Sequence, residues 1–400
     1  MENDSVNRRS FLQAMGSAGL LSTLPSSAFA AAMDGKAVYE VAAADPAPAP
    51  VAKNKIRFSV IGVDHYHIMG MTAAVIRGGG ELVSVYATAP KQIADFQKQF
   101  PQAKLARSEE EILNDPSIQL VAGAPIPDQR TPLGIRVMRH GKDYLSDKPA
   151  VTTLEQLDEV RHVIAETKRI FAIMYSERLE VRAAVKAGEL IQQGAIGRVV
   201  QTVNLAPHQT NPASRPDWFW DKKRYGGILC DIGSHQADQF VYYTNSKRAE
   251  VTHSQVANVA HDMYPNFEDF GDMTMVGDGG LGYVRVDWFT PQGLGVWGDG
   301  RLFVLGTEGY IELRKYVDVL GHPGGNHLFI VDQKQARYID CKDVELPFGP
   351  QFVDDILNRT QVGQNQAQAL LATELVLKAQ KAAKLLFLKQ DPYYGERPPE

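Results

Sequence analysis

Between Ile56 and Met174, segments typical of β-strands alternate with segments typical of helices, and this alternation limits the possible folds more than any other feature of the sequence. Runs of apolar and β-branched residues are followed by glycines and then by longer helical segments. Strands that alternate with helices of this length form a parallel sheet with helices on both faces. We therefore predict an α/β domain over residues 55–175. The expected strands are 56–61, 82–86, 120–123, 144–145 and 170–174. One expected helix follows the first strand and ends near 77, and another begins at 108. The other expected helices span 90–100, 131–140 and 153–168.

The second half of the chain has a different pattern, with strand-like segments that follow one another closely. This spacing predicts an α+β domain over residues 176–400, built on a large, mostly antiparallel sheet. A helical segment from about 364 to 388 is expected to close the domain. Two domains suit a chain of 400 residues, of which 44% are hydrophobic and 22% charged. The expected strands are 199–203, 251–256, 272–276, 281–288, 301–305 and 310–313.

The first thirty residues have the order of a secretory signal. A twin arginine, Arg8-Arg9, is followed by an apolar run over 14–24 and by the small residues of Ala28-Phe29-Ala30. This order predicts a twin-arginine signal peptide over residues 1–30, which would direct the protein to the bacterial export machinery and the periplasm. The apolar run is too short to span a bilayer stably. Residues 31–54, rich in alanine and proline, are expected to form an extended arm.

Charge and cysteine content exclude some classes of protein. The net charge of −5 and the isoelectric point near 6.1 give no basic footprint for nucleic acid. The chain has two cysteines, Cys230 and Cys341. A bridge between them is chemically possible in an oxidising compartment, although we do not expect one. The broad second-domain sheet offers a plausible surface for a homo-oligomer.

The turn after the first strand is the expected phosphate-binding turn of a dinucleotide site. Such a site uses G-x-G-x-x-G, because glycines let backbone N–H groups approach the pyrophosphate at a helix N-terminus. Here the run is Gly62-Val63-Asp64-His65-Tyr66-His67, which keeps only the first glycine. A carboxylate at Asp64 disfavours a pyrophosphate unless it turns away or is neutralised. Two other interpretations of this run are a metal site made by Asp64, His65 and His67, and simple helix capping by Asp64.

The end of the second strand bears on the identity of the nucleotide. An acidic residue there binds the ribose hydroxyls of NAD, but this sequence has Thr88 and Lys91 instead. These residues slightly favour the 2′-phosphate of NADP over NAD. The predicted cofactor contacts are Gly62, Val63, Asp64, His65, Thr88, Pro125 and Lys148, and we predict no bound metal.

Two further segments carry groups that can act on a substrate. Lys148, in Ser146-Asp147-Lys148-Pro149, follows a short strand at the edge of the crevice, where its ammonium can stabilise a developing alkoxide. In the run from Gly226 to His235, Asp231 and His235 are four residues apart and share one face if the segment is helical. His235 can then act as a general base, with Asp231 orienting either the imidazole or the substrate. Each segment taken alone is also compatible with a structural role.

Taken in order, the strand–turn–helix at 56–77, Asp147-Lys148-Pro149 and the run from Gly226 to His235 resemble the Gfo/Idh/MocA oxidoreductase family. The resemblance covers residues 55 to 388. It implies a Rossmann domain that binds NAD or NADP, tightly held in some exported members. It also implies catalytic roles for Lys148, Asp231 and His235, with Asp147 in place of the usual glutamate. Secondary candidates for substrate contact are Tyr175, Arg178, His208, Trp218 and Gln239.

The sequence thus predicts an exported oxidoreductase that transfers a hydride between a bound nicotinamide and a sugar, glycoside or polyol. Two alternatives remain open from the sequence. One is a redox-neutral or metal-assisted lyase or hydrolase acting on sugars on the same scaffold, and the other is a non-catalytic sugar-binding protein.

Overall fold

The computed structural model describes residues 56–387, and its N-terminal domain is a six-stranded parallel sheet. The strand order is β3-β2-β1-β4-β5-β6, so the order reverses between β1 and β4. In a sheet of this kind the ligand crevice opens at the carboxyl ends of the strands beside that reversal. The elements are β1 (Ile56–Ile61), α3 (Ile68–Arg77), β2 (Gly80–Tyr86), α4 (Pro90–Gln99), β3 (Lys104–Leu105), α5 (Glu109–Leu113), β4 (Leu120–Gly123), α6 (Pro127–Arg139), β5 (Asp143–Asp147), α7 (Leu154–Thr167) and β6 (Phe171–Met174).

Local sequence explains where several of these helices begin. The side chain of Ser108 accepts a hydrogen bond from the backbone N–H of Glu111, and that of Thr153 accepts one from Gln156, so both residues cap helices. Helix α5 also begins with three glutamates, which favour the positive end of its dipole. The strands between the helices are buried on both faces, as parallel strands in a doubly wound sheet are.

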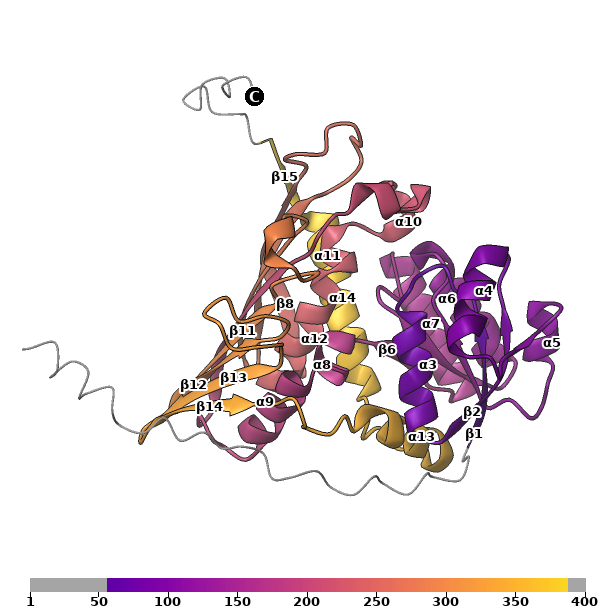
Figure 1. The fold of residues 1–400 in the computed structure, drawn as a ribbon, viewed down its shortest axis with the longest axis horizontal. Coiled ribbons are helices and arrows are strands. Elements are labelled where there is room, and N and C mark those ends of the chain that lie inside the picture. Colours follow the sequence, from indigo (N-terminus) through magenta and orange to yellow (C-terminus); the bar gives the residue numbers. More distant parts are fainter. Residues whose placement is uncertain (1–55, 388–400) are drawn as a thin grey trace, which may run out of the picture.

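The C-terminal domain is built on a nine-stranded sheet in the order β14-β13-β12-β11-β7-β10-β9-β8-β15. Helices α11, α12 and α14 lie between this sheet and the N-terminal domain (Figure 1). The elements are α8 (Ser176–Leu179), α9 (Arg182–Gln192), β7 (Val199–Pro207), η1 (Pro212–Ser214), η2 (Asp217–Trp220), α10 (Lys222–Tyr225), α11 (Ile228–Asp231), α12 (Gly233–Thr244), β8 (Ala249–Ala257), β9 (Phe270–Gly277), β10 (Gly280–Asp287), η3 (Gln292–Leu294), β11 (Arg301–Gly306), β12 (Gly309–Arg314), β13 (His327–Asp332), β14 (Ala336–Asp340), α13 (Phe348–Asn358), α14 (Gln366–Ala382) and β15 (Lys384–Leu386).

The predicted fold class is confirmed, with an N-terminal Rossmann sheet and a large, mostly antiparallel C-terminal sheet. Two pairs in the second sheet, β7 with β10 and β8 with β15, are parallel. Alternation of buried and exposed residues along β11 shows that helices cover one face only.

The predicted closing helix from 364 to 388 was wrong at its end. Helix α14 stops at Ala382, and Lys384–Leu386 adds to the edge of β8 as strand β15. The open backbone groups of the β8 edge accept this segment, so tertiary pairing prevails over its helical composition. The hairpin of β13 and β14 and the helix α13 were not predicted.

The C-terminal segment also packs back onto the N-terminal domain. Helix α13 lies against α3, and the stretch that leads into α14 closes the free edge of β6. There the side-chain amide of Gln364 accepts from the backbone N–H of Ile173 at 2.9 Å and donates to its carbonyl at 2.7 Å. Gln366 accepts from the N–H of Phe171 at 2.9 Å. Two glutamine side chains therefore take the place of a neighbouring strand.

Several predictions concern the ends of the chain or its cysteines. The signal peptide over 1–30 and the arm over 31–54 lie outside the described residues. Within residues 56–387, no helix is both long and apolar enough to cross a bilayer. Cys230 and Cys341 are buried and unbridged.

Candidate active site

A cavity of about 500 Å³ opens between the two domains, at the carboxyl ends of β1, β5 and β6. Both domains contribute to its wall, which contains all three predicted catalytic residues. The lining residues are Asp64, His65, Tyr66, His67, Pro127, Arg130, Lys148, Ser176, Glu177, His208, Ser214, Arg215, Pro216, Trp218, Phe219, Asp231, His235, Trp288, Trp297 and Tyr316.

The turn after β1 keeps the geometry of a dinucleotide-binding turn at its first glycine. Gly62 has φ of +79°, and a Cβ placed there would lie 2.8 Å from the Cβ of Pro125. The N–H of Gly62 donates to Tyr86 at 2.9 Å, and its carbonyl accepts from Ala124 at 3.0 Å, so the turn is pinned between β2 and β4. A side chain at this position would be both strained and obstructed. This turn, at the strand-order reversal, fits a nicotinamide dinucleotide.

Asp64, in the second glycine position, is the feature that fits a pyrophosphate least well. Its carboxylate lines the cavity, and burial raises its pKa above the ordinary value, with Arg130 acting in the opposite direction. The direction of this shift shows that burial disfavours the charged form of the Asp64 carboxyl group.

Asp147 explains what the two histidines of the turn do. The Nδ1 atoms of His65 and His67 donate to its two carboxylate oxygens, at 2.6 Å and 2.9 Å. The guanidinium of Arg130 lies 2.9 Å from the same carboxylate, and the N–H of Lys148 donates to it at 2.8 Å. Burial alone would raise the pKa of Asp147, but Arg130 and the histidines outweigh it and hold that pKa well below its ordinary value. This fully buried carboxylate therefore fixes the turn after β1 relative to the turn after β5.

His65, His67 and Asp147 also form a group that could in principle hold a metal ion, since one ligand atom of each lies within 4.8 Å of the others. The set differs from the one considered from sequence, because Asp147 takes the place of Asp64. Both oxygens of Asp147 are already engaged by hydrogen bonds, and a cation here would lie beside the Arg130 guanidinium. Hydrogen bonding accounts for this cluster without an ion.

Lys148 and Asp231 form a direct ion pair across the domain boundary. Lys148 Nζ lies 2.8 Å from Asp231 Oδ1, and the Lys148 side chain is 6% exposed. Burial would raise the pKa of Asp231, but Lys148 prevails and lowers it. The ammonium has three donors, of which Asp231 occupies one. The carboxylate therefore orients Lys148. From the sequence, Asp231 was expected to orient either the imidazole of His235 or the substrate, and no hydrogen bond joins it to that imidazole.

His235 reaches the same cavity from the first turn of α12. Its side chain is buried, and its Nδ1 has no hydrogen-bond partner among residues 56–387. Burial lowers the pKa of His235 well below its ordinary value. The imidazole is therefore neutral near pH 7 and can accept a proton. Gly226 and Gly227, with φ of +91° and +93°, make the turn that brings this segment to the cavity.

The remaining wall is aromatic and carries one more buried carboxylate. His208 lines the cavity between Trp288 and Trp297, and burial lowers its pKa to about 4. Glu177 also lines the cavity and accepts from Lys315 Nζ at 2.6 Å. Burial would raise the pKa of Glu177, but Lys315 and the nearby histidines lower it.

Of the five predicted substrate contacts, the structure places His208 and Trp218 on the cavity wall and three others away from it. Tyr175 is buried and hydrogen-bonds Thr373 at 2.9 Å. Arg178 pairs with Asp238 at 2.5 Å and does not line the cavity. Gln239 is buried and accepts from Lys315 at 2.8 Å.

The predicted cofactor residues are divided in the same way. Asp64, His65 and Lys148 line the cavity, whereas Gly62, Val63 and Pro125 form the turns behind it. Thr88 is exposed just beyond the end of β2. Lys91, its proposed partner for a 2′-phosphate, pairs with Asp95 at 2.6 Å.

Sequence reasoning missed Arg130, Glu177, Arg215, Trp288 and Trp297, all of which line the cavity. Glu177 and Arg215 had a usable signal, since Glu177 follows the last Rossmann strand and Arg215 precedes the aromatic run at 216–220. The others lie in segments whose approach to the site depends on the fold.

Comparisons with known proteins agree with this geometry. Residues 56–175 match a family model described as an oxidoreductase family with an NAD-binding Rossmann fold. Residues 184–312 match the model of the GFO/IDH/MocA C-terminal domain. The two models cover most of the residues that line the cavity, and Ser176, Glu177 and Tyr316 lie outside the matched ranges.

Curated relatives include sugar and polyol enzymes. The chain is 28% identical to 1,5-anhydro-D-fructose reductase of Ensifer adhaerens over 50% of its length and 60% of the relative's. It is 24% identical to scyllo-inositol 2-dehydrogenase (NAD(+)) of Bacillus subtilis, over 74% of its length and 85% of the relative's.

Solved structures show the same fold over most of the chain. A protein of Erwinia carotovora atroseptica, assigned as an oxidoreductase, is 47% identical with a TM-score of 0.81, covering 83% of this chain and 100% of that one. A levoglucosan dehydrogenase in complex with NADH and levoglucosan shares the fold with a TM-score of 0.67 at 16% identity, covering 82% of this chain and 97% of that one.

Proposed function

Because this chain belongs to the Gfo/Idh/MocA oxidoreductase family, as its motifs predicted, we propose that it oxidises or reduces a sugar, glycoside or polyol with a bound nicotinamide cofactor. One observation carries the proposal. Lys148, Asp231 and His235 come from distant parts of the chain and line one cavity at the carboxyl end of the Rossmann sheet. Relatives that act on anhydrofructose and scyllo-inositol support a polyhydroxylated substrate.

The bound nicotinamide supplies the acceptor or donor of the hydride at the substrate carbon. Lys148 donates to the substrate oxygen and stabilises the negative charge that develops there during oxidation. Asp231, held at 2.8 Å, keeps that ammonium aimed into the cavity. One such preorganised donor contributes about 100-fold to 1000-fold in rate in comparable sites.

His235 takes the hydroxyl proton during oxidation and returns it during reduction. Its lowered pKa leaves the ring neutral at neutral pH, so the free base is the resting form. The imidazole has no competing hydrogen bond at Nδ1 within residues 56–387. The aromatic wall around His208 and Trp218 presents flat apolar surface to a sugar ring.

The test compares His235→Asn with His253→Asn, an exposed histidine on β8 that lies outside the cavity. Oxidation of a panel of sugars and polyols is followed by formation of the reduced nicotinamide. We expect His235→Asn to lose turnover by about 100-fold or more, the usual scale of general-base catalysis, while His253→Asn keeps it. Normal turnover in folded His235→Asn would contradict the assignment.

Cofactor retention is tested separately. The protein is purified without added nucleotide and denatured, and released nucleotide is identified by absorbance and mass. We expect NAD or NADP near one per chain. No nucleotide, and none bound on titration, would contradict both retention and nicotinamide-dependent chemistry.

We also propose export by the twin-arginine route, from the sequence of residues 7–30. That route carries folded proteins, so a cofactor inserted in the cytoplasm would accompany the enzyme. Changing Arg8 and Arg9 to lysine should keep the protein in the cytoplasmic fraction, whereas the unchanged chain should reach the periplasm. Equal distribution of the two proteins would contradict export by this route.

A further inference from the structure

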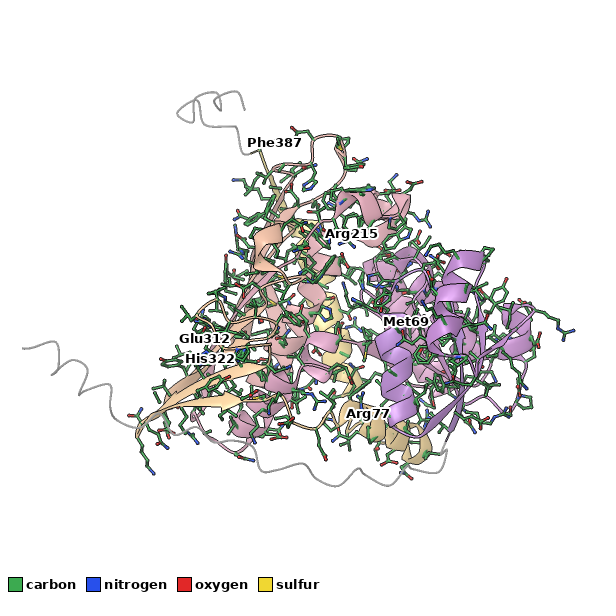
Figure 2. All side chains as sticks on the ribbon, in the orientation of Figure 1. Met69, Arg77, Arg215, Glu312, His322 and Phe387 are labelled. Carbon is green, nitrogen blue, oxygen red and sulfur yellow. The ribbon has the colours of Figure 1, made fainter. Side chains whose placement is uncertain are left out.

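Arg215 is a partly buried cation on the cavity wall, and it has no anionic partner among residues 56–387. We propose that it binds the anionic group of the substrate, so that the enzyme acts on a sugar that carries a carboxylate or a phosphate. The proposal deepens the proposed function and rests on it. Figure 2 labels Arg215 on the side of the C-terminal domain that faces the Rossmann domain.

The charges on the cavity wall are paired at every arginine and lysine except this one. Arg130 is neutralised by Asp147 at 2.9 Å, and Lys148 by Asp231 at 2.8 Å. Within residues 56–387, no carboxylate lies within ion-pair distance of Arg215. Paired charges leave little field for a ligand, whereas an unpaired and partly buried cation attracts an anion.

Two other carboxylates line the cavity and have no arginine or lysine of the wall as an ion-pair partner. Neither of them forms an ion pair with Arg215. Glu177 is bound to Lys315 at 2.6 Å. Asp64 is influenced by Arg130 and Arg224, and it makes no ion pair among the described residues. An anion from the substrate would therefore complete the charge balance beside Arg215.

Aromatic rings hold the guanidinium in a fixed orientation. Its central carbon lies 4.3 Å from the ring centre of Phe219, 4.9 Å from that of Trp288 and 4.8 Å from that of Trp297. These faces are attractive to a cation but do not neutralise it. A guanidinium packed against aromatic rings is preorganised for the two-pronged binding of a carboxylate or phosphate.

The hydrogen bonds of Arg215 fix one edge of the group and leave the rest for a ligand. Nε donates to the carbonyl of Thr210 at 2.7 Å, and Nη2 donates to that of Gln209 at 3.1 Å. Nη1 has no partner among residues 56–387. Since a guanidinium has five N–H donors, three remain after these two bonds.

The electrostatic state of Arg215 agrees with this arrangement. Burial lowers its pKa to about 10, with a smaller opposite effect from Asp231. The side chain therefore remains charged at neutral pH, although it has lost much of its hydration. Arg215 and the ion pair of Lys148 with Asp231 line the same cavity. A sugar could thus present its hydroxyl to Lys148 and its anionic group to Arg215.

The competing explanation is that Arg215 only fastens its own loop to the aromatic wall. The two explanations differ in ligand preference. The experiment uses cofactor-loaded His235→Asn, which blocks turnover, and measures binding by titration calorimetry. The probes are glucose, glucuronate and glucose 6-phosphate, with the same sets in the galactose and mannose series.

We expect an anionic member of at least one series to bind about tenfold or more tightly than its neutral parent, the scale of one charge-assisted bond. Adding Arg215→Gln should abolish that preference and change the affinity for the neutral sugar less than about threefold. Arg215→Lys, which keeps the charge, should retain part of the preference. Arg248→Gln, at an exposed arginine with a side chain 90% exposed, is the matched control and should retain all of it. Tighter binding of the uronate identifies a carboxylate, and tighter binding of the phosphate ester identifies a phosphate.

Three outcomes would overturn the proposal: neutral sugars bind as tightly as their anionic partners, Arg215→Gln weakens both equally, or no anionic sugar of the three series binds. If Arg215→Gln does not fold, Arg215→Met is used in its place, and an undiminished preference in that folded variant also overturns the proposal. The experiment distinguishes a failure of this proposal from a failure of the dehydrogenase assignment. Arg215-dependent binding without turnover by the unchanged enzyme rejects only that assignment, and turnover of neutral sugars without anion preference rejects only the present proposal.

Discussion

Replacing Asp147 with asparagine should destabilise the protein far more than a single lost charge usually does. The substitution keeps the size of the side chain and removes its negative charge. It leaves the guanidinium of Arg130, whose side chain is 1% exposed, without a carboxylate at 2.9 Å. The amide has one acceptor oxygen, whereas the carboxylate accepts from both His65 and His67. One imidazole N–H would then face an amide N–H.

The expected cost follows from the burial of the pair. Breaking a buried ion pair by removing one partner costs about 3–5 kcal/mol, because the remaining charge stays buried and uncompensated. The same change at Asp95, which pairs with Lys91 at 2.6 Å, should cost no more than about 0.5 kcal/mol, since those side chains are 56% and 88% exposed. The two pairs have similar distances but differ in burial and in the number of hydrogen bonds that the carboxylate accepts, so the comparison measures the cost of changing a buried and fully hydrogen-bonded carboxylate.

The assay is urea unfolding of the two variants and the unchanged protein at pH 7, with the midpoint and slope both recorded. Adding Arg130→Met to Asp147→Asn should recover part of the loss, because it removes the orphaned charge. The reasoning is refuted if Asp147→Asn shifts the midpoint no more than Asp95→Asn does, or if Arg130→Met makes the double variant still less stable.

Three further predictions concern catalysis and the cofactor turn. Lys148→Met should lower kcat/KM by about 100-fold or more, because it removes the donor to the substrate oxygen. The measurement is steady-state kinetics, and a clearly smaller loss of kcat/KM would contradict this role. Since burial lowers the pKa of His235, this base stays neutral as the pH falls. The value of kcat/KM for oxidation should therefore decline only below the ordinary histidine pKa of about 6.5. A midpoint above that pKa in the pH profile would show that another group limits the rate. Gly62→Ala should weaken nicotinamide binding at least tenfold and lower thermal stability by about 1–2 kcal/mol, because φ is +79° and Pro125 fills the space; unchanged affinity in fluorescence titration would oppose this.

Most of the strands and the candidate catalytic residues were predictable because their signals are local. Most Rossmann strands are short apolar runs followed by a helix, and this alternation predicts a parallel sheet but not the order of its strands. Lys148 comes directly after a strand, so its place at the crevice follows from the chain direction alone. The position of the Gly226–His235 segment required the family resemblance in addition.

The contacts that organise the site were not predictable in this way. Asp147 meets its histidine partners across 82 and 80 residues of chain, so only the folded sheet brings them together. The prediction of substrate contacts was wrong for Tyr175 and Arg178. They are adjacent to the site in sequence, but their side chains bind other residues outside the cavity. Proximity along the chain fixes the position of a backbone segment and not the direction of each side chain.

The glutamines on the edge of β6 have a consequence for biosynthesis. The Rossmann domain leaves the ribosome first, yet its last open edge is covered by Gln364 and Gln366, and α13 covers α3. A nascent chain that has completed every Rossmann strand still exposes that edge, with unpaired backbone groups able to join another chain. The domain therefore reaches its final form only after residues 364–366 have been synthesised, and aggregation before that point is a hazard that follows from the order of the elements in the chain.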